Sequence, residues 1–196
     1  MGYVLKKQKR IGILGGTFNP PHMGHFVLAQ EALKRLKLNK VVFMPVFIPP
    51  HKKVKNNKAS IRCKMLTLAC RTNSRFEVSR LELERKGVSY SIDTLRKLRN
   101  KYGKSAELFF IAGSDSLRNL ESWKNIDKVL KLVNFVVAAR PGFPVKKIKR
   151  KVKLITLPAL NISSSVIRKR VRLSQSIRYL VPEDVRKFII RRGLYK

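Results

Sequence analysis

Apolar residues in this chain form short continuous runs that alternate with longer stretches in which apolar positions recur every three or four residues. Most of the short runs contain few polar residues, which is typical of strands covered on both faces. The longer stretches have the spacing of one face of a helix. The predicted strands are residues 11–14, 40–46, 76–83, 107–112, 134–139 and 153–157.

The predicted helices lie between these strands and after the last one. Ser91 is a good N-cap for the helix over 92–102, which Gly103 ends, and Pro182 stands in the first turn of the last helix. The predicted helices are residues 26–36, 60–72 and 92–102, a helix with Leu117, Leu120 and Trp123, a helix with Ser164 and Arg168, and residues 182–193.

Strands and helices take turns along the chain, with no internal repeat, low-complexity tract or linker. This alternation favours a mostly parallel sheet with helices on both faces. A chain of 196 residues, 44% of them hydrophobic, is long enough to bury a sizeable core. We therefore predict a single domain over residues 1–196, an α/β fold with a Rossmann-like, doubly wound sheet.

The charge of the chain is unusual, because 45 Lys and Arg residues oppose 11 Asp and Glu residues and give a net charge of +34. Such a charge attracts polyanions and acidic substrates. A nucleic-acid-binding module is therefore a rival hypothesis. The sequence has no zinc finger, basic zipper or RNP-like strand, and its densest basic cluster, residues 146–153, is typical of a solvated loop. We expect no specific nucleic-acid partner.

The two cysteines indicate a reduced environment. Cys63 and Cys70 lie seven positions apart in one predicted helix, which places their Cα atoms roughly 10 Å apart. This separation is too large for a disulfide, so we predict two buried thiols in a cytoplasmic protein. No apolar run approaches the length of a membrane span, and we expect no membrane partner. The sequence leaves the oligomeric state open, a homo-oligomer included.

The richest candidate site is residues 15–25, GGTFNPPHMGH, between the first predicted strand and the first predicted helix. Its glycines allow a tight turn and a close approach of backbone to ligand. The helix then begins with free N–H groups beside His22 and His25, which are three positions apart and have Gly24 between them. This combination predicts an anion site, most simply for phosphate. The alternative is a loop with two surface histidines.

A second candidate anion site is residues 161–168, NISSSVIR. Ser164 and Arg168 are four positions apart and share a helix face, so a hydroxyl, a backbone amide and a guanidinium converge there. A capped, exposed basic helix is the alternative.

Further polar residues follow predicted strands, at the sheet edge where ligands bind in open α/β folds. His51 and Lys52 follow the second strand, Asp115 follows Gly113, and Arg140 follows the strand over 134–139. Each of them could instead be an ordinary loop or capping residue. Trp123 is either a core residue or a flat surface for stacking on a ring.

Taken together, these segments resemble a known family. GGTFNPPHMGH resembles the HxGH signature of the nucleotidyltransferase superfamily, and its GGTFxPPHxGH form looks like that of bacterial nicotinate-nucleotide adenylyltransferases. The PPHK loop, SYSIDTL, the GxDSLxxLxxW block and ISSSxIR are similar to further segments of that family, so the resemblance runs from about residue 10 to the C-terminus. Family members often have Asp at the position of Asn19 and Thr at that of Ser91.

The resemblance implies transfer of the adenylyl group of ATP to nicotinic acid mononucleotide (NaMN) in NAD biosynthesis. It implies Mg²⁺ carried with ATP, and no metal site built from protein side chains. It implies that the catalytic residues are His22, His25, Lys52 and Arg168. The ATP-binding residues that it implies are Gly15, Gly16, Thr17, Phe18, His22, Gly24, His25, Gly113, Asp115, Arg140, Ile162, Ser163, Ser164 and Arg168. The NaMN-binding residues that it implies are Lys52, Tyr90, Ser91 and Trp123.

Two related enzyme classes share part of this pattern. Pantetheine-phosphate adenylyltransferases have both phosphate motifs but usually lack the SYSIDTL and SLRNLESW blocks, and they are the alternative within the enzyme class. Class I aminoacyl-tRNA synthetases also have HxGH, but this chain has no KMSKS segment.

Overall fold

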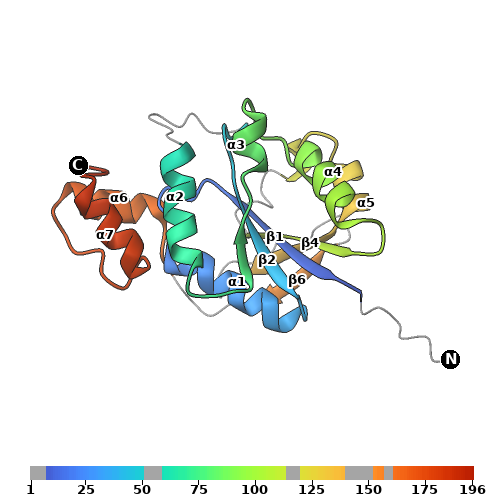
Figure 1. The fold of residues 1–196 in the computed structure, drawn as a ribbon, viewed down its shortest axis with the longest axis horizontal. Helices are drawn as coiled ribbons and strands as arrows, with labels where there is room; N and C mark the ends of the chain where they lie inside the picture. The colour runs from blue at the N-terminus through green and yellow to red at the C-terminus, as the bar shows by residue number, and fades with distance from the viewer. Residues whose placement is uncertain (1–7, 51–58, 114–119, 140–151, 157–160) are drawn as a thin grey trace.

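A computed structural model of the protein describes residues 8–50, 59–113, 120–139, 152–156 and 161–196. Strands and helices alternate along these residues, as the sequence predicts (Figure 1). The elements are β1 (Arg10–Gly16), α1 (Met23–Arg35), β2 (Lys40–Pro45), α2 (Ala59–Cys70), β3 (Phe76–Val78), α3 (Leu81–Arg85), α4 (Ser91–Tyr102), β4 (Glu107–Gly113), α5 (Ile126–Leu132), β5 (Asn134–Ala139), β6 (Lys153–Thr156), α6 (Ser164–Arg172) and α7 (Glu183–Arg191).

The six strands form one sheet in the order β3-β2-β1-β4-β5-β6, and every neighbouring pair is parallel. Strand β1 lies in the middle, where Ile13 pairs with Val42 of β2 on one side and with Phe110 of β4 on the other. From β1 the chain adds β2 and β3 on one side and then crosses over to add β4, β5 and β6 on the other side. The switch point of this doubly wound sheet therefore lies between β1 and β4. The predicted α/β, Rossmann-like fold is confirmed.

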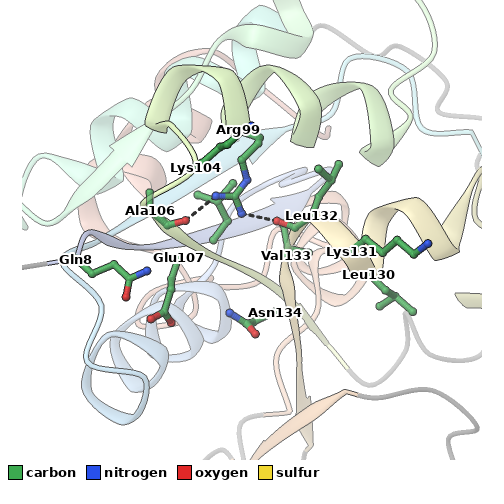
Figure 2. A pocket seen from close by; sticks show the side chains of 11 residues that line it. Gln8, Arg99, Lys104, Ala106, Glu107, Leu130, Lys131, Leu132, Val133 and Asn134 are labelled. Carbon is green, nitrogen blue, oxygen red and sulfur yellow. Dashed lines mark hydrogen bonds between the residues drawn. The ribbon is translucent and has the colours of Figure 1, made fainter.

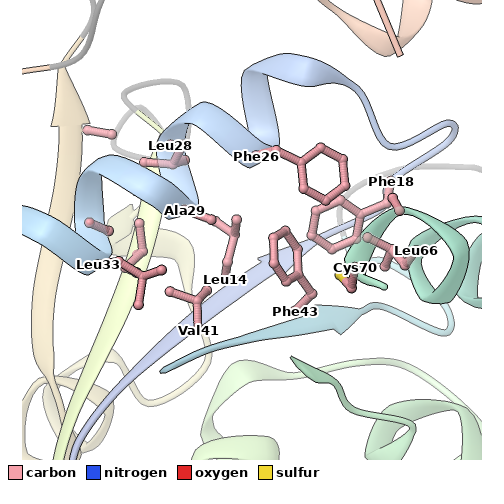
Figure 3. Packing of buried hydrophobic residues seen from close by; sticks show 14 of the residues in the cluster. Leu14, Phe18, Phe26, Leu28, Ala29, Leu33, Val41, Phe43, Leu66 and Cys70 are labelled. Carbon is pink, nitrogen blue, oxygen red and sulfur yellow. The ribbon is translucent and has the colours of Figure 1, made fainter. Parts of the chain in front are cut away.

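Helices cover both faces of the sheet because successive strand residues point to opposite sides. On one face, Leu14, Val41 and Phe43 pack with α1 and α2 (Figure 3). Helices α6 and α7 add residues to the same apolar cluster. On the other face, Ile13 and Val42 pack with α4 and α5. The chain thus has two buried apolar layers, and helices α6 and α7 lie beside α2 at one end of the molecule (Figure 1).

The strand predicted over residues 76–83 is wrong in its second half. Only Phe76–Val78 pairs with β2, and the chain then turns and forms the short helix α3. The Ser79 hydroxyl accepts a hydrogen bond from the backbone N–H of Leu81, at 3.3 Å, as that helix begins. Leu81 and Leu83 resume an apolar-polar alternation after Ser79 and Arg80 have shifted its phase, and so short an apolar pattern does not separate a strand from a helical turn.

Three other predictions about helices need correction. Ser91 is the first residue of α4, and Tyr90, with its extended backbone, is the N-cap. Pro182 is likewise the N-cap of α7 and lies outside its first turn. Helix α5 has no counterpart among the predicted helices, whereas the described part of the helix predicted through Leu120 and Trp123 is a short 3₁₀ turn.

Both cysteines are buried and free of disulfides, in agreement with the prediction. None of the helices in the described part of the chain has the length and apolar character that crossing a bilayer requires.

Candidate functional site

The candidate site lies at the carboxyl ends of the central strands, beside the switch point between β1 and β4. Strand β1 ends at Gly16, where the GGTFNPPHMGH loop leaves the sheet, and β4 ends at Gly113. In open α/β sheets the crevice at this position holds the ligand. The fold therefore brings the predicted loop to the expected edge.

Phe18 shapes the first part of the loop from inside the protein. Its backbone has a φ of 50°, which is uncommon for a bulky residue, and its ring is only 2% exposed. The ring lies 4.8 Å from the His25 ring in an edge contact and 5.9 Å from that of Phe43. A Cβ on Gly16 would lie 3.0 Å from the Phe18 ring, so the glycine makes room for this packing.

The two histidines lie side by side at the start of α1. His22 is the N-cap, and its backbone N–H donates to Nδ1 of His25 over 3.1 Å. A neutral His25 ring that accepts at Nδ1 has its hydrogen on Nε2, which then acts as a donor. The ring centroids are 3.7 Å apart. A Cβ at Gly24 would come within 3.2 Å of His22 Nδ1, so this glycine leaves the imidazole its space.

The second predicted anion motif contacts the first directly. Ser163 caps α6 by accepting from the backbone N–H of Val166 over 3.2 Å. The Ser164 hydroxyl donates to the Pro20 carbonyl over 2.8 Å, and Arg168 Nη1 donates to the Asn19 carbonyl over 2.7 Å. Two segments that are about 145 residues apart in the sequence therefore meet at the amino end of α1.

Ile162 extends this contact toward the histidines. Its carbonyl oxygen lies 3.9 Å from the place that a Cβ on Gly24 would occupy. Six predicted residues, His22, Gly24, His25, Ile162, Ser164 and Arg168, therefore lie in or beside one junction between the loop and α6.

A cavity of about 190 Å³ lies next to the loop and collects a second set of predicted residues. Its lining includes Gly15, Gly16, Thr17, Tyr90, Ser91 and Trp123. Trp123 packs edge-on against Phe110 and Phe135, at 5.6 and 5.8 Å between ring centroids, and it also borders the cavity. The tryptophan is therefore part of the core and of the cavity wall at the same time.

Arg62 is a site-supporting residue that the sequence analysis does not identify. Its side chain is 2% exposed and donates to the carbonyls of Thr17 and Val46, each over 2.6 Å, and to that of Phe47 over 3.2 Å. Burial lowers the pKa of Arg62 below its ordinary value. The guanidinium thereby joins the loop after β1 to the loop after β2. An arginine in an amphipathic helix usually faces solvent, so its position in the sequence carries no signal of this role.

Glu82 is a second buried charged residue, and the sequence analysis does not identify it either. It is 4% exposed, borders the cavity and accepts from the Thr94 hydroxyl over 2.6 Å. Burial raises the pKa of Glu82, and the hydroxyls of Ser89 and Thr94 oppose that rise. The short helix α3, which the sequence analysis reads as strand, brings this carboxyl under α4.

Comparison with known proteins identifies the family. Residues 13–170 match the model of the family described as Cytidylyltransferase-like. A protein of Moorella thermoacetica named "Probable nicotinate-nucleotide adenylyltransferase" is 42% identical over 95% of this chain and 92% of its own length. A protein of Desulfitobacterium hafniense with the same name is 44% identical over 96% of each chain. The chain belongs to the nicotinate-nucleotide adenylyltransferase family.

A solved structure shares the fold. Plasmodium falciparum nicotinic acid mononucleotide adenylyltransferase, complexed with NaAD, superimposes with a TM-score of 0.79 at 22% identity, and the match covers 96% of this chain and 98% of that one. The two chains therefore share one fold.

Three residues that the family resemblance assigns to the site, Lys52, Asp115 and Arg140, lie outside the described residues. Among the residues that are described, no group of three or more His, Cys, Asp or Glu side chains could hold a metal ion. Glu82, which borders the cavity, is therefore not part of a metal-binding cluster of described residues.

A second cavity, of about 340 Å³, lies at the amino ends of β4 and β5, on the side of the sheet away from the candidate site (Figure 2). Arg99 crosses it and donates to the carbonyls of Ala106 and Leu132, each over 2.6 Å. These contacts connect the chain before β4 with the end of α5, so the guanidinium stabilises two element junctions. The cavity borders the amino ends of β4 and β5, where the adenylyltransferase fold is not expected to bind nucleotide.

Proposed function

We propose that this protein transfers the adenylyl group of ATP to NaMN and forms nicotinic acid adenine dinucleotide and pyrophosphate. The observation that carries the proposal is the direct contact between the two anion motifs, through Ser164 to Pro20 and Arg168 to Asn19. Membership of the nicotinate-nucleotide adenylyltransferase family supports the choice of substrates. The predicted cytoplasmic location and the oligomeric state stay predictions.

The reaction requires no general base. A phosphate oxygen of NaMN attacks the α-phosphorus of ATP, the new P–O bond forms, and the bond from the α-phosphorus to the bridging oxygen breaks. Pyrophosphate leaves with that electron pair. A phosphomonoester has its second pKa near about 6, so the nucleophile is already ionised at neutral pH. The protein's task is to align two polyanions and to stabilise charge that moves toward the leaving group.

His22 and His25 stabilise that charge. With Nδ1 of His25 accepting from the His22 backbone, Nε2 of His25 presents its hydrogen to a phosphate oxygen. The edge contact with Phe18 holds the ring in this orientation. The amino end of α1 adds its positive dipole end at the same place.

Ser164 and Arg168 bind the β- and γ-phosphates. Arg168 gives one hydrogen bond to Asn19 and another to Ser165, and its planar guanidinium has five N–H groups in total. The remaining donors suit a phosphate, which a guanidinium binds through two parallel hydrogen bonds.

The cavity beside the loop binds the nicotinate half of NaMN. Tyr90 and Ser91 lie at the amino end of α4, which favours a carboxylate over a neutral carboxamide. Trp123 supplies an aromatic surface in the cavity wall for the pyridine ring. Lys52 neutralises the reacting phosphates, and Asp115 and Arg140 complete the ATP site, as the family resemblance implies.

Mg²⁺ enters with ATP, bound mainly by phosphate oxygens and water. The described residues offer donors to phosphate and no cluster of acidic ligands, which fits a metal carried by the substrate. When it is bound, the ion neutralises the charge of the triphosphate.

One assay tests the function and its alternative. The protein is incubated with ATP, Mg²⁺ and one of three acceptors, namely NaMN, nicotinamide mononucleotide or phosphopantetheine, and products are separated by chromatography. We expect the dinucleotide and pyrophosphate with NaMN. A product only with phosphopantetheine would move the protein to the pantetheine-phosphate class, and no product with any acceptor would refute adenylyl transfer.

A further inference from the structure

The carboxyl-terminal part of the chain forms hydrogen bonds at four points with residues 15–25, the segment that contains His22 and His25. Besides the bonds from Ser164 and Arg168, the backbone N–H of Met23 donates to the Leu180 carbonyl over 2.9 Å. The Tyr195 hydroxyl donates to Oδ1 of Asn19 over 2.7 Å. We call these four residues, Ser164, Arg168, Leu180 and Tyr195, the carboxyl-terminal clasp.

Tyr195 differs from the other members of the clasp. It follows α7 and belongs to neither of the two phosphate motifs, residues 15–25 and 161–168. Its backbone has a φ of 69°, which is unfavourable for an aromatic residue. Such a conformation persists when surrounding contacts fix it, and here the side chain packs on the core and reaches Asn19. Burial raises the pKa of Tyr195, so its hydroxyl remains a donor.

We propose that Tyr195 is a positioning residue for adenylyl transfer: its hydrogen bond to Asn19 fixes the loop that presents His22 and His25 to the triphosphate. The proposal rests on the proposed function of that loop. It assigns Tyr195 no contact with substrate, and its effect passes through Asn19.

The geometry explains how a contact at Asn19 reaches the imidazoles. Asn19 is three residues before His22, and Met23, the next residue, is held by Leu180. His22 therefore lies between two points that the clasp fixes. Because the His22 backbone N–H also binds Nδ1 of His25, a shift of the loop moves both rings. A displacement of about 1 Å at a reacting group can lower a rate by about a hundredfold.

The contact needs an acceptor oxygen at position 19. Asn19 supplies it with its amide, and a carboxylate, which family members often have there, would supply it equally. The hydrogen bond to Tyr195 therefore requires a side-chain oxygen at position 19, whichever of the two groups supplies it.

The test removes one oxygen atom. Tyr195→Phe deletes the hydroxyl and keeps the ring, and Tyr179→Phe is the matched control because Tyr179 is 79% exposed and outside the clasp. We expect kcat with saturating ATP and NaMN to fall about tenfold in Tyr195→Phe, as a lost buried hydrogen bond allows. The control should keep the wild-type kcat. A Tyr195→Phe variant that loses thermal stability but keeps kcat would reduce Tyr195 to a structural role and overturn the proposal.

A double-mutant cycle tests whether the effect passes through Asn19. Asn19→Ala removes the acceptor, so adding Tyr195→Phe should lower kcat no further than Asn19→Ala does alone. Fully additive losses would show that the tyrosine acts elsewhere, and the proposed route would then be wrong.

A readout that needs no turnover separates this proposal from the proposed function. The chain has three histidines, so imidazole nitrogen signals are few enough to assign by NMR. We expect those of His22 and His25 to shift in Tyr195→Phe and to stay unchanged in Tyr179→Phe. If the wild-type protein formed no dinucleotide, the function would fail, while unchanged imidazole signals would refute the clasp independently.

Discussion

Replacing Arg62 by methionine tests how the site is supported. The substitution keeps most of the apolar length of the side chain and removes a guanidinium that donates to the carbonyls of Thr17, Val46 and Phe47. The substitution therefore removes the side-chain link between the loops after β1 and β2 and leaves the backbone bond from Val46 to the Gly16 carbonyl. We expect the variant to fold with lower stability and to lose the fixed arrangement of the loops after β1 and β2 beside the candidate site.

The size of the effect follows from the contacts. Each buried carbonyl that loses its donor costs about 1–3 kcal/mol. The low end applies here, because removal of Arg62 also removes the cost of burying a cation, as its lowered pKa reflects. Three carbonyls then give a loss of about 3 kcal/mol in the free energy of unfolding. For a chain of this size that loss lowers Tm by about 6–12 °C.

Urea unfolding followed by circular dichroism measures this loss, and Lys64→Met on the exposed side of the same helix is the control. The control should differ from the wild-type protein by less than about 0.5 kcal/mol. An Arg62→Met protein as stable as the control would mean that water replaces the guanidinium without cost, and the interpretation of Arg62 as the link between the two loops would be wrong.

Three further variants test the site. His25→Ala should lower kcat by orders of magnitude with unchanged circular dichroism, and a near-normal kcat would remove the catalytic assignment. Gly24→Ala places a methyl group 3.2 Å from His22 Nδ1, so kcat should fall at unchanged Tm in steady-state assays, and an unchanged kcat would show that the imidazole does not need this space. Because burial raises the pKa of Glu82 from 4.5, its protonated form stabilises the fold at low pH, and this stabilisation is lost as the pH rises through the raised value. Urea titrations at several pH values measure the free energy of unfolding. As the pH rises through the raised pKa, this free energy should fall less in Glu82→Gln than in the wild-type protein, and an equal dependence on pH in the two proteins would contradict this.

The order of the elements could be predicted from the sequence because it follows from local patterns. Buried parallel strands such as β2 and β4 are continuous apolar runs, and the helices between them have helical spacing and recognisable ends. The GGTFNPPHMGH loop was likewise readable, since glycines, prolines and histidines in one short segment have specific backbone and donor properties. Such signals depend only on neighbours in the sequence.

The supporting residues could not be predicted, because their roles depend on partners far along the chain. Arg62 and Glu82 look like ordinary surface charges in helical or strand-like segments, and only the tertiary structure buries them. The bond from Tyr195 to Asn19 joins positions 176 residues apart, for which no periodic pattern exists. The length of β3 could not be predicted for a related reason, since pairing with β2, and not the pattern of its own residues, sets where this strand ends.

The hydrogen bonds of Arg168 connect the two anion motifs into one structural unit. Its guanidinium binds the Asn19 carbonyl and the Ser165 hydroxyl, so contacts within the protein orient the side chain. An oriented arginine loses less rotamer freedom on binding than a mobile one. The carbonyl that orients it belongs to the loop that ends in His22, and the Ser164 hydroxyl binds the same loop at the Pro20 carbonyl. In the reaction proposed above, a phosphate bound by Arg168 would therefore also act on the histidines, which couples charge at the β- and γ-phosphates to alignment at the α-phosphate.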